Sequence, residues 1–187
     1  MEIRDLTGRH AVTVVGAAPK RVLTGGPDGL GYTEFGGAGC LELADPGGDF
    51  LNASAGPYCI EVVAWVFPPC DLFDGNSGSS DSSILDTVGG FYASDTALSL
   101  SGYRGHYSIY SGMQPWADAG LAGTWVRVRY DIRPGRRCDV YLNGQLALAD
   151  RGAGTLVNST GVLRIGGRVG FNGYYTKARL AGIRITR

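Results

Sequence analysis

The amino-acid sequence predicts an all-β sandwich, and three observations lead to that class. Short segments rich in β-branched and aromatic residues follow one another along the whole chain. The 31 glycines show no Gly-X-Y period and separate these segments, as tight turns require. No helical period of apolar residues persists for ten residues. Because no repeat or interdomain linker interrupts the 187 residues, we expect a single domain over residues 1–187.

The sequence marks the predicted strands with different clarity. The clearest strand covers residues 58–67, where β-branched and aromatic residues continue up to two prolines that end it. Other strands are predicted at residues 83–88, 97–101, 106–111, 124–132, 137–142, 161–165 and 178–186. Weaker patterns mark residues 11–15, 31–35 and 40–43.

Alternation in residues 124–132 predicts how this strand is exposed. Val126, Val128 and Tyr130 alternate with Trp125 and two arginines. Successive side chains of a strand point to opposite faces, so apolar groups point one way and mainly arginines the other. This pattern is typical of an antiparallel sheet with one face in water.

Two turns connect the strands around residues 137–142. Asn143-Gly144 lies between two apolar-rich segments and predicts a type I′ hairpin, in which both central residues have positive φ. The sequence Arg-Pro-Gly-Arg at residues 133–136 predicts another hairpin turn just before it. Three consecutive strands joined in this way form a meander.

Charge and hydropathy exclude several classes of function. Basic and acidic residues both number 17, so no overall charge attracts the chain to nucleic acid or acidic membranes. No apolar run approaches the roughly 20 residues of a membrane helix. The first residues lack the basic and then apolar pattern of a signal peptide. We therefore expect no nucleic-acid partner and no membrane insertion.

The four cysteines do not predict a metal site. They are widely spaced and form no Cys-x-x-Cys pair, which argues against structural zinc. Cys59 and Cys138 lie within strand patterns and are expected to be small buried apolar residues. Without an export signal, reduced thiols are favoured over disulfides.

Several blocks of the chain occur in a recognisable order. Residues 60–68 place Glu61 and Trp65 among apolar residues, and residues 140–144 read Val-Tyr-Leu-Asn-Gly. The other blocks are residues 5–8 with 36–41, 123–128 with 130–131, 163–167, 171–173 and 183–185. Together they make the chain similar to the laminin-G-like branch of the concanavalin A-like lectin/glucanase superfamily.

This resemblance implies a jelly-roll β-sandwich of two antiparallel sheets, one of them curved and concave. It also implies that Trp65 and Trp125 occupy core positions and serve packing. Function stays open, because the superfamily contains lectins, glycosidases, adhesion modules and structural domains.

The residues needed for catalysis are not in the required patterns. Glycosidases of the superfamily that this chain resembles carry acidic residues at alternating positions of one strand. Here Glu61 is followed on the same face of its strand by Val63 and Trp65, which are not acidic. His10 and His106 are the only histidines, and no Gly-x-Ser-x-Gly motif occurs. We therefore predict that the chain is not an enzyme.

One polar loop is a candidate calcium site. Residues 71–82 are rich in glycine and serine and contain four oxygen donors, the ligands that this hard cation prefers: Asp71, Asp74, Asn76 and Asp81. The loop lacks EF-hand spacing and a closing glutamate, so a solvated polar loop is the alternative. Calcium is the one cofactor that the sequence suggests.

Aromatic residues form a candidate ligand-binding cluster. Trp116, in a loop beside Pro115, is the best exposed candidate, together with Tyr103, Tyr107 and Tyr110. Aromatic faces stack on the C–H surfaces of sugars. A partner or oligomer contact and ordinary packing are the alternatives.

Two functions from different classes remain. The first is a non-catalytic structural or adhesion module of a bacteriophage virion, in a tail, a fibre or a capsid decoration, where it would contact other structural proteins and form a homo-oligomer. Virion localisation would reconcile a module of extracellular type with the lack of an export signal, and the bias of arginine over lysine suits a GC-rich host. The second is a calcium-assisted carbohydrate-binding module that recognises cell-surface glycans.

Overall fold

The computed structural model describes residues 8–44, 56–66, 83–86, 99–103, 106–110, 123–133, 137–152, 162–167 and 175–186. Within these ranges the chain forms two sheets of antiparallel strands and one short 3-10 turn, η1 (Pro27–Gly29). The predicted fold class, a jelly-roll sandwich of two antiparallel sheets, is confirmed. No helix in the described part of the chain is long and apolar enough to span a membrane.

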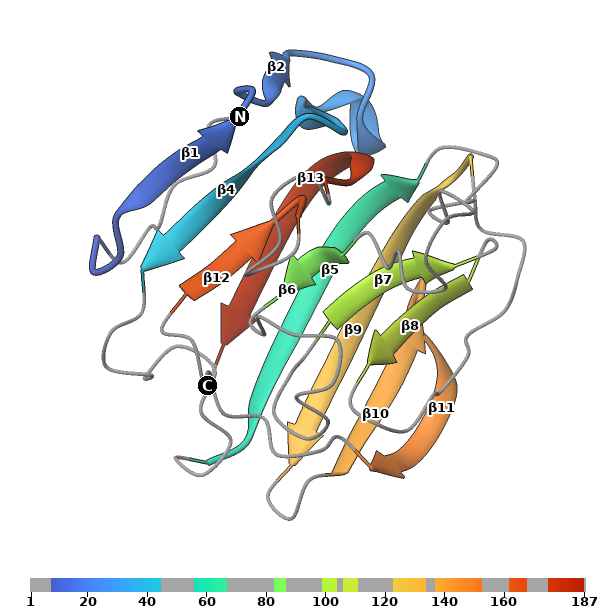
Figure 1. Ribbon diagram of the computed structural model, residues 1–187. Coiled ribbons are helices and arrows are strands. Elements are labelled where there is room, and N and C mark those ends of the chain that lie inside the picture. The colour runs from blue at the N-terminus through green and yellow to red at the C-terminus, as the bar shows by residue number, and fades with distance from the viewer. Residues whose placement is uncertain are drawn as a thin grey trace.

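The first sheet has six strands in the order β1-β4-β12-β6-β7-β8, and all neighbours are antiparallel. It lies in front in Figure 1, with β1 at one edge and β8 at the other. Its strands are β1 (Val12–Gly16), β4 (Gly39–Ala44), β6 (Ser83–Asp86), β7 (Ser99–Tyr103), β8 (His106–Tyr110) and β12 (Val162–Ile165).

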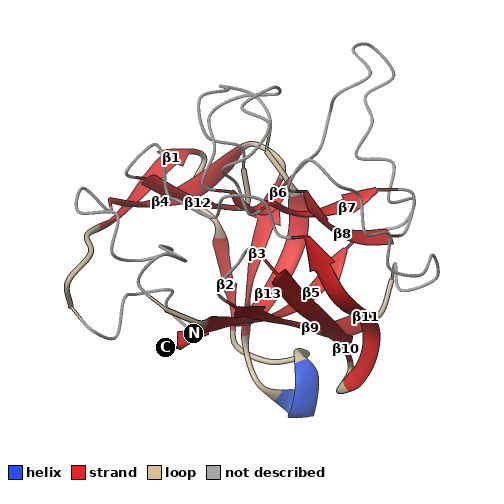
Figure 2. Cartoon of the chain, turned by 90° about the horizontal axis from the view of Figure 1, so that it is seen from below, coloured by secondary structure: helices blue, strands red, loops and turns tan. Residues whose placement is uncertain are grey.

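The second sheet has seven strands in the order β11-β10-β9-β5-β13-β3-β2, again antiparallel. Figure 2 shows the two sheets as stacked layers, with the seven-stranded sheet below. Its strands are β2 (Lys20–Val22), β3 (Tyr32–Gly36), β5 (Tyr58–Val66), β9 (Trp125–Arg133), β10 (Arg137–Leu142), β11 (Gln145–Gly152) and β13 (Lys177–Thr186).

The hydrophobic core lies between the layers and is built by both sheets. The buried residues at its centre come from alternate positions of β5 and β9, as the period of two in a strand requires. Those contributed by the six-stranded sheet are Leu41, Leu43, Leu85, Leu163 and Ile165. Those contributed by the seven-stranded sheet are Phe35, Tyr58, Ile60, Val62, Ala64, Val126, Val128, Tyr130, Ile132, Val140 and Leu180.

Most predicted strands are confirmed within two residues at each end, and residues 137–142 match β10 exactly in extent. The short strand β2 and the η1 turn were not predicted. The apolar-rich segment after the Asn143-Gly144 turn, residues 145–148 in the sequence pattern, forms the start of β11, which continues to Gly152. Among the described cysteines, Cys40 is a buried thiol, whereas Cys59, which was expected to be buried, is only partly buried because its side chain lies on the same face as its register partner Asp131.

The Asn143-Gly144 hairpin is confirmed, with φ values of +50° and +83° at the two residues. The backbone N–H of Asn143 donates to the carbonyl oxygen of Arg127 at 2.8 Å. In return, the N–H of Arg127 donates to Oδ1 of Asn143 at 2.9 Å. These two bonds tie the turn between β10 and β11 to strand β9.

Strand β13 lies inside the seven-stranded sheet, although it is the last strand of the chain. It pairs with β5 on one side and with β3 on the other. Figure 1 shows β13 beside β5, which precedes it by more than a hundred residues. The middle of this sheet is therefore assembled from distant parts of the sequence.

Candidate functional site

One face of the seven-stranded sheet points away from the core, and we call it the outer face. Four apolar residues of β9 are buried in the core, whereas Arg127, Arg129 and Arg133 are exposed on the other side. The predicted alternation of apolar and arginine side chains is confirmed. On β5, Glu61 lies opposite Arg129 and therefore belongs to the same outer face.

A row of cross-strand neighbours crosses the outer face from β2 to β9. Each residue in it lies directly opposite the next one on the adjacent strand. The row consists of Lys20, Glu34, Arg179, Trp65 and Trp125, and we call it the aromatic row.

The indole ring of Trp125 packs edge-to-face on two other aromatic rings. Its centroid lies 5.8 Å from that of Trp65 and 5.6 Å from that of Tyr32 on β3. Since β5 and β13 separate β9 from β3, their backbones would be about 14 Å apart in a flat sheet. Trp125 and Tyr32 therefore reach toward each other over the intervening strands. Tyr32 is only 8% exposed although it lies outside the core cluster.

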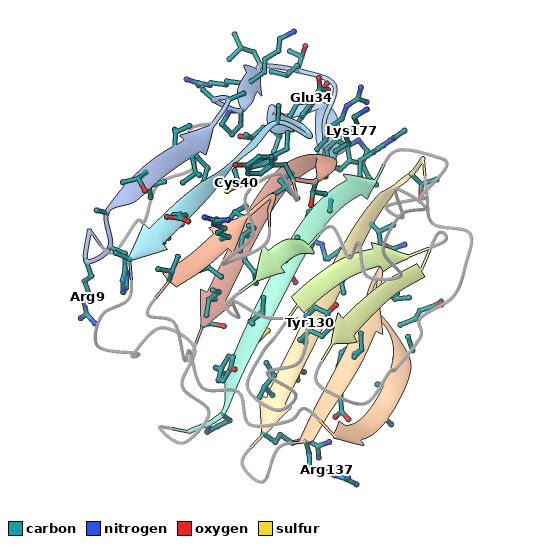
Figure 3. The ribbon with its side chains drawn as sticks, in the orientation of Figure 1. Arg9, Glu34, Cys40, Tyr130, Arg137 and Lys177 are labelled. Carbon is teal, nitrogen blue, oxygen red and sulfur yellow. The ribbon has the colours of Figure 1, made fainter. Side chains whose placement is uncertain are left out.

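Arg179 connects the aromatic rings to an acidic partner. Its guanidinium carbon lies 5.4 Å from the ring centroid of Tyr32 and 5.6 Å from that of Trp65. Its Nε donates to Oε2 of Glu34 at 2.8 Å. Figure 3 labels Glu34 and Lys177 at this end of the sheet and Arg137 at the opposite end. The ion pair and the cation–π contacts hold the rings in one arrangement.

The expectation that Trp65 and Trp125 are core residues is wrong. They lie directly opposite each other on the outer face, and neither belongs to the core cluster between the sheets. Both are only partly buried, because their cover comes from each other, Tyr32 and Arg179. The physical reason is register: Val126 and Ala64, their neighbours in sequence, fill the inner positions.

The loop between β2 and β3 borders the aromatic row. It is held by hydrogen bonds from the N–H of Gly26 to the oxygen of Leu30, and from the N–H of Leu30 to the oxygen of Pro27, at 2.8 and 3.0 Å. A Cβ at Gly25 would lie 3.9 Å from Cε1 of Tyr32. Figure 2 shows the η1 turn projecting on the outer side of the sheet. Leu23 and Leu30, which precede and follow η1 in this loop, are 68% and 64% exposed.

A second row crosses the outer face from β13 to β11. The register aligns Arg184, Glu61, Arg129, Tyr141 and Leu146, and we call these residues the charged row. The guanidinium of Arg129 lies 5.0 Å from the Tyr141 ring centroid. It also pairs with Asp131 through two hydrogen bonds, of which Nε to Oδ1 measures 2.7 Å.

The acidic groups on this face are engaged with arginines. Asp131 and Asp139 lie opposite each other on β9 and β10, and Arg133 Nη2 donates to Oδ1 of Asp139 at 2.8 Å. Hydrogen bonds from Arg129 lower the pKa of Asp131 below its usual value of 3.8, which outweighs the opposing effect of burial. Asp131 is therefore ionised at neutral pH, and an ionised carboxylate cannot act as the general acid of a glycosidase.

The aromatic residues predicted from the sequence lie elsewhere. Tyr103 is on β7, and Tyr107 and Tyr110 are on β8, at the edge of the six-stranded sheet. Their register partners are His106, Gly102 and Ser99. Trp116 and the predicted calcium ligands Asp71, Asp74, Asn76 and Asp81 lie outside the described residues. The ranges that are described contain no group of three acidic, histidine or cysteine side chains suited to a metal ion.

The aromatic row was not predicted as a site from the sequence. Its signal was present in residues 124–132, because the alternation that placed arginines in water placed Trp125 there as well. The contribution of Tyr32 had no such signal, since β3 joins β13 only through the folded topology.

No protein-family model and no curated protein matches the chain in sequence. Solved structures match it in fold. Domain 4 of AbnA, an extracellular arabinanase from Geobacillus stearothermophilus, was solved in complex with arabinotriose. It has 15% identity and a TM-score of 0.65, and the match covers 97% of this chain and 84% of that one. At this identity the likeness concerns the fold alone.

Two toxin domains are similar in the same way. The binding domain of Paraclostridial Mosquitocidal Protein 1 has 12% identity and a TM-score of 0.65, over 98% of this chain and 46% of that chain. The receptor binding domain of a botulinum neurotoxin C/D mosaic serotype has 8% identity and a TM-score of 0.66, over 97% and 44%. This chain therefore spans less than half of either toxin chain. The neighbours are β-sandwich domains that include carbohydrate-binding and receptor-binding modules.

Proposed function

We propose that the chain is a non-catalytic carbohydrate-binding module and that the sugar lies on the aromatic row of the outer face. The observation that carries this proposal is the cluster of Trp65, Trp125 and Tyr32 on the water side of the sheet. It is fixed by Arg179 and stands apart from the hydrophobic core.

Such a cluster suits a sugar for two physical reasons. Aromatic rings offer apolar faces to sugar C–H groups, while neighbouring polar side chains bond the hydroxyls. The rings also lose little freedom on binding, because edge-to-face contacts and the Arg179–Glu34 pair already hold them. Lys20, which lies opposite Glu34, adds a hydrogen-bond donor at the end of the row.

The non-catalytic part of the proposal is supported by the acids of the outer face. Glu34, Asp131 and Asp139 each accept a hydrogen bond from an arginine, and Glu61 lies 3.8 Å from Arg127. A retaining glycosidase needs one carboxyl that stays protonated at neutral pH, and the hydrogen bonds from Arg129 lower the pKa of Asp131 away from that role. The neighbour solved with arabinotriose is consistent with binding by this architecture.

Affinity electrophoresis in gels that contain arabinan, xylan, β-glucan or dextran tests the proposal. We expect at least one polysaccharide to retard the chain. Trp125→Ala should then weaken binding by about five- to twelvefold, because it removes a stacking face worth about 1–1.5 kcal/mol. Trp125→Phe keeps an aromatic face and should retain most binding. Equal retardation of the wild type and Trp125→Ala by a bound polysaccharide would refute the aromatic row as the site.

Finer assignments remain proposals that rest on the sequence. We propose a single laminin-G-like domain over residues 1–187 that serves as an adhesion component of a bacteriophage virion, in contact with other virion proteins and as a homo-oligomer. The arginine bias over lysine supports this origin. Mass spectrometry of purified particles should find the chain among the structural proteins. Its absence from particles would leave the glycan-binding module without the virion role.

Calcium in the loop of residues 71–82 is a separate proposal with its own measurement. A cation that binds only the folded state must raise the melting temperature. We therefore expect a chelator to lower that temperature and Asp74→Asn to remove the difference. An unchanged melting temperature would mean that no tight structural calcium occupies this loop.

A further inference from the structure

The formal charges of the chain are distributed unevenly over its surface. The complete sequence has 17 basic and 17 acidic residues. On the outer face, the described strand side chains include twice as many basic as acidic groups. The basic ones are Lys20, Arg127, Arg129, Arg133, Arg137, Lys177, Arg179 and Arg184, and the acidic ones are Glu34, Glu61, Asp131 and Asp139. These strand side chains therefore contribute a formal net charge of +4 to the outer face, whereas the whole sequence has a formal net charge of zero.

Glu61 marks the centre of this positive surface. Arg129 and Arg184 lie directly opposite it on the two adjacent strands, and Nη1 of Arg127 is 3.8 Å from its Oε1. We call Arg127, Arg129 and Arg184 the arginine cluster. One carboxylate faces three guanidinium groups here, so the local charge is unbalanced even though Arg129 is also paired with Asp131.

Two members of the arginine cluster are available to a ligand. The side chain of Arg127 is 57% exposed, and its 3.8 Å contact with Glu61 is too long for a hydrogen bond. Arg184 is exposed, and within the described residues no carboxylate lies at ion-pairing distance from it. Such guanidinium groups can bind a carboxylate or sulfate through two parallel hydrogen bonds.

The arginine cluster and the aromatic row belong to one continuous surface. Trp65 and Glu61 lie on the same face of β5, four residues apart, which corresponds to about 14 Å along a strand. Only Val63 and its partner Arg127 lie between them on these two strands. This span exceeds one sugar ring, so a ligand that contacts both groups has to be an oligosaccharide.

We propose that the ligand of the outer face is an anionic polysaccharide, with carboxylate or sulfate groups at Arg127 and Arg184 and an uncharged ring face on Trp65 and Trp125. This inference rests on the proposed sugar-binding function and adds the chemical class of the sugar. Because the cluster is exposed, its attraction is screened by salt. Binding should therefore be strongest at low ionic strength.

Two pairs of polysaccharides with matched backbones test the class. Polygalacturonate and its methyl ester differ in carboxylate charge, and dextran sulfate and dextran differ in sulfate charge. We expect the charged member of at least one pair to bind about tenfold or more tightly than its uncharged partner. Raising the salt concentration from about 0.05 M to about 0.5 M should remove most of that preference. A preference within the polygalacturonate pair would identify carboxylate as the bound group, and a preference within the dextran pair would identify sulfate.

Substitutions that remove positive or negative charges test whether the arginine cluster is the site that binds the anionic groups. Arg127→Gln combined with Arg184→Gln should weaken binding of the charged polysaccharide by about tenfold, while Glu61→Gln should strengthen it because it removes the opposing charge. Arg9→Gln removes one positive charge before β1, the edge strand of the other sheet (Figure 3), and should have no effect. Thermal melts of all variants verify that they fold.

The outcomes separate this inference from the proposed function. Equal affinity for the charged and uncharged members of both pairs overturns the anionic ligand and leaves sugar binding intact. A charge preference that survives the double arginine substitution, or is equally reduced by Arg9→Gln, overturns the arginine cluster as its site. Failure to bind any charged polysaccharide also overturns the inference, and the neutral panel with Trp125→Ala then decides the proposed function by itself.

Discussion

Arg164 is the most deeply buried charged side chain among those in the described ion pairs, with 9% of its side chain exposed. Its neighbours Leu163 and Ile165 point into the core, so Arg164 lies on the opposite face of the six-stranded sheet, across from Glu42. Its Nε donates to Oε1 of Glu42 at 2.5 Å. A buried guanidinium without its carboxylate is costly, so Glu42 has a structural role that its position in the sequence does not reveal.

Replacing Glu42 should destabilise the protein measurably. We expect Glu42→Gln to lower the free energy of unfolding by about 2 kcal/mol, because the buried Arg164 then keeps its charge but loses the carboxylate of Glu42. Asp139→Asn removes a carboxylate that pairs with Arg133, whose side chain is 47% exposed, and should cost less than about 1 kcal/mol. Urea denaturation measures both, and equal losses would contradict the distinction.

Asp131 gives stability a dependence on pH. Because Arg129 lowers its pKa in the folded state, the folded protein favours the ionised carboxylate more than the unfolded chain does. This contribution is present above the ordinary pKa of 3.8 and is lost as pH falls through the lower folded value. Thermal melts between pH 6 and pH 2 should therefore show a smaller acid destabilisation for Asp131→Asn than for the wild type. Parallel curves would show that the pair contributes nothing.

Individual side chains were predictable only where a local pattern decides their environment. The alternation along residues 124–132 correctly separated Val126 and Val128 from the exposed arginines. The same rule applied to Trp125 would have placed it in water, but the family resemblance favoured the core. Tyr32 gave no local signal, because its burial depends on Trp125 and Arg179 from other strands.

At the level of elements, the turn of the β10–β11 hairpin is hydrogen-bonded to strand β9, which carries part of the candidate site. Asn143 exchanges two hydrogen bonds with the backbone of Arg127, which lies between the aromatic row and the charged row. The position of Arg127 on the outer face therefore depends partly on a turn that contacts no ligand.

Asn143→Ala should weaken both the fold and the site. It removes the acceptor for the Arg127 N–H and strains a residue at φ +50°, so we expect a loss of about 1–2 kcal/mol in unfolding free energy. Asn143→Asp keeps an acceptor oxygen and tolerates this backbone conformation, and it should cost less. Chemical denaturation compares the two variants. An alanine variant as stable as the aspartate variant would contradict the role of the side chain.

A strand could be predicted from the sequence where the β propensity of its own residues is high enough to mark it. Long strands such as β5 and β9 have enough β-branched and aromatic residues to be recognised. β2 consists of Lys20, Arg21 and Val22, and only its pairing with β3 makes it a strand. The far end of β11 similarly depends on pairing with β10 across two register shifts.

On the scale of the whole molecule, both sheets share one core. Leu163 of β12 and Val62 of β5 belong to the same buried cluster, although they lie in different layers. We therefore expect one cooperative unfolding transition, as the single-domain proposal requires.

A substitution in one sheet should consequently shift the unfolding of the other. Leu163→Ala in the six-stranded sheet should cost about 3 kcal/mol. Far-ultraviolet circular dichroism follows both sheets, whereas tryptophan fluorescence, measured in a Trp116→Phe background, reports Trp65 and Trp125 of the seven-stranded sheet. Both midpoints should move together. A shift in dichroism with an unchanged fluorescence midpoint would indicate two independent units.

The order of strands was less predictable than the class of fold. Neighbours joined by short turns, such as β9, β10 and β11, follow from the hairpin signals. The pairing of β13 with β5 and β3 joins segments far apart in the chain, and periodicity contains no information about it. The two-sheet arrangement was expected because of the family resemblance.

The central position of β13 has a consequence for biosynthesis. Translation proceeds at roughly 5–20 residues per second, so about 6–24 seconds separate the synthesis of β5 from that of β13. During that interval the edges of β5 and β3 that β13 will occupy have no native partner. Such edges readily pair with other chains, so this sheet of the nascent protein is most exposed to aggregation just before β13 is made. Chaperone demand during expression should therefore depend on how quickly the ribosome translates the codons for β13.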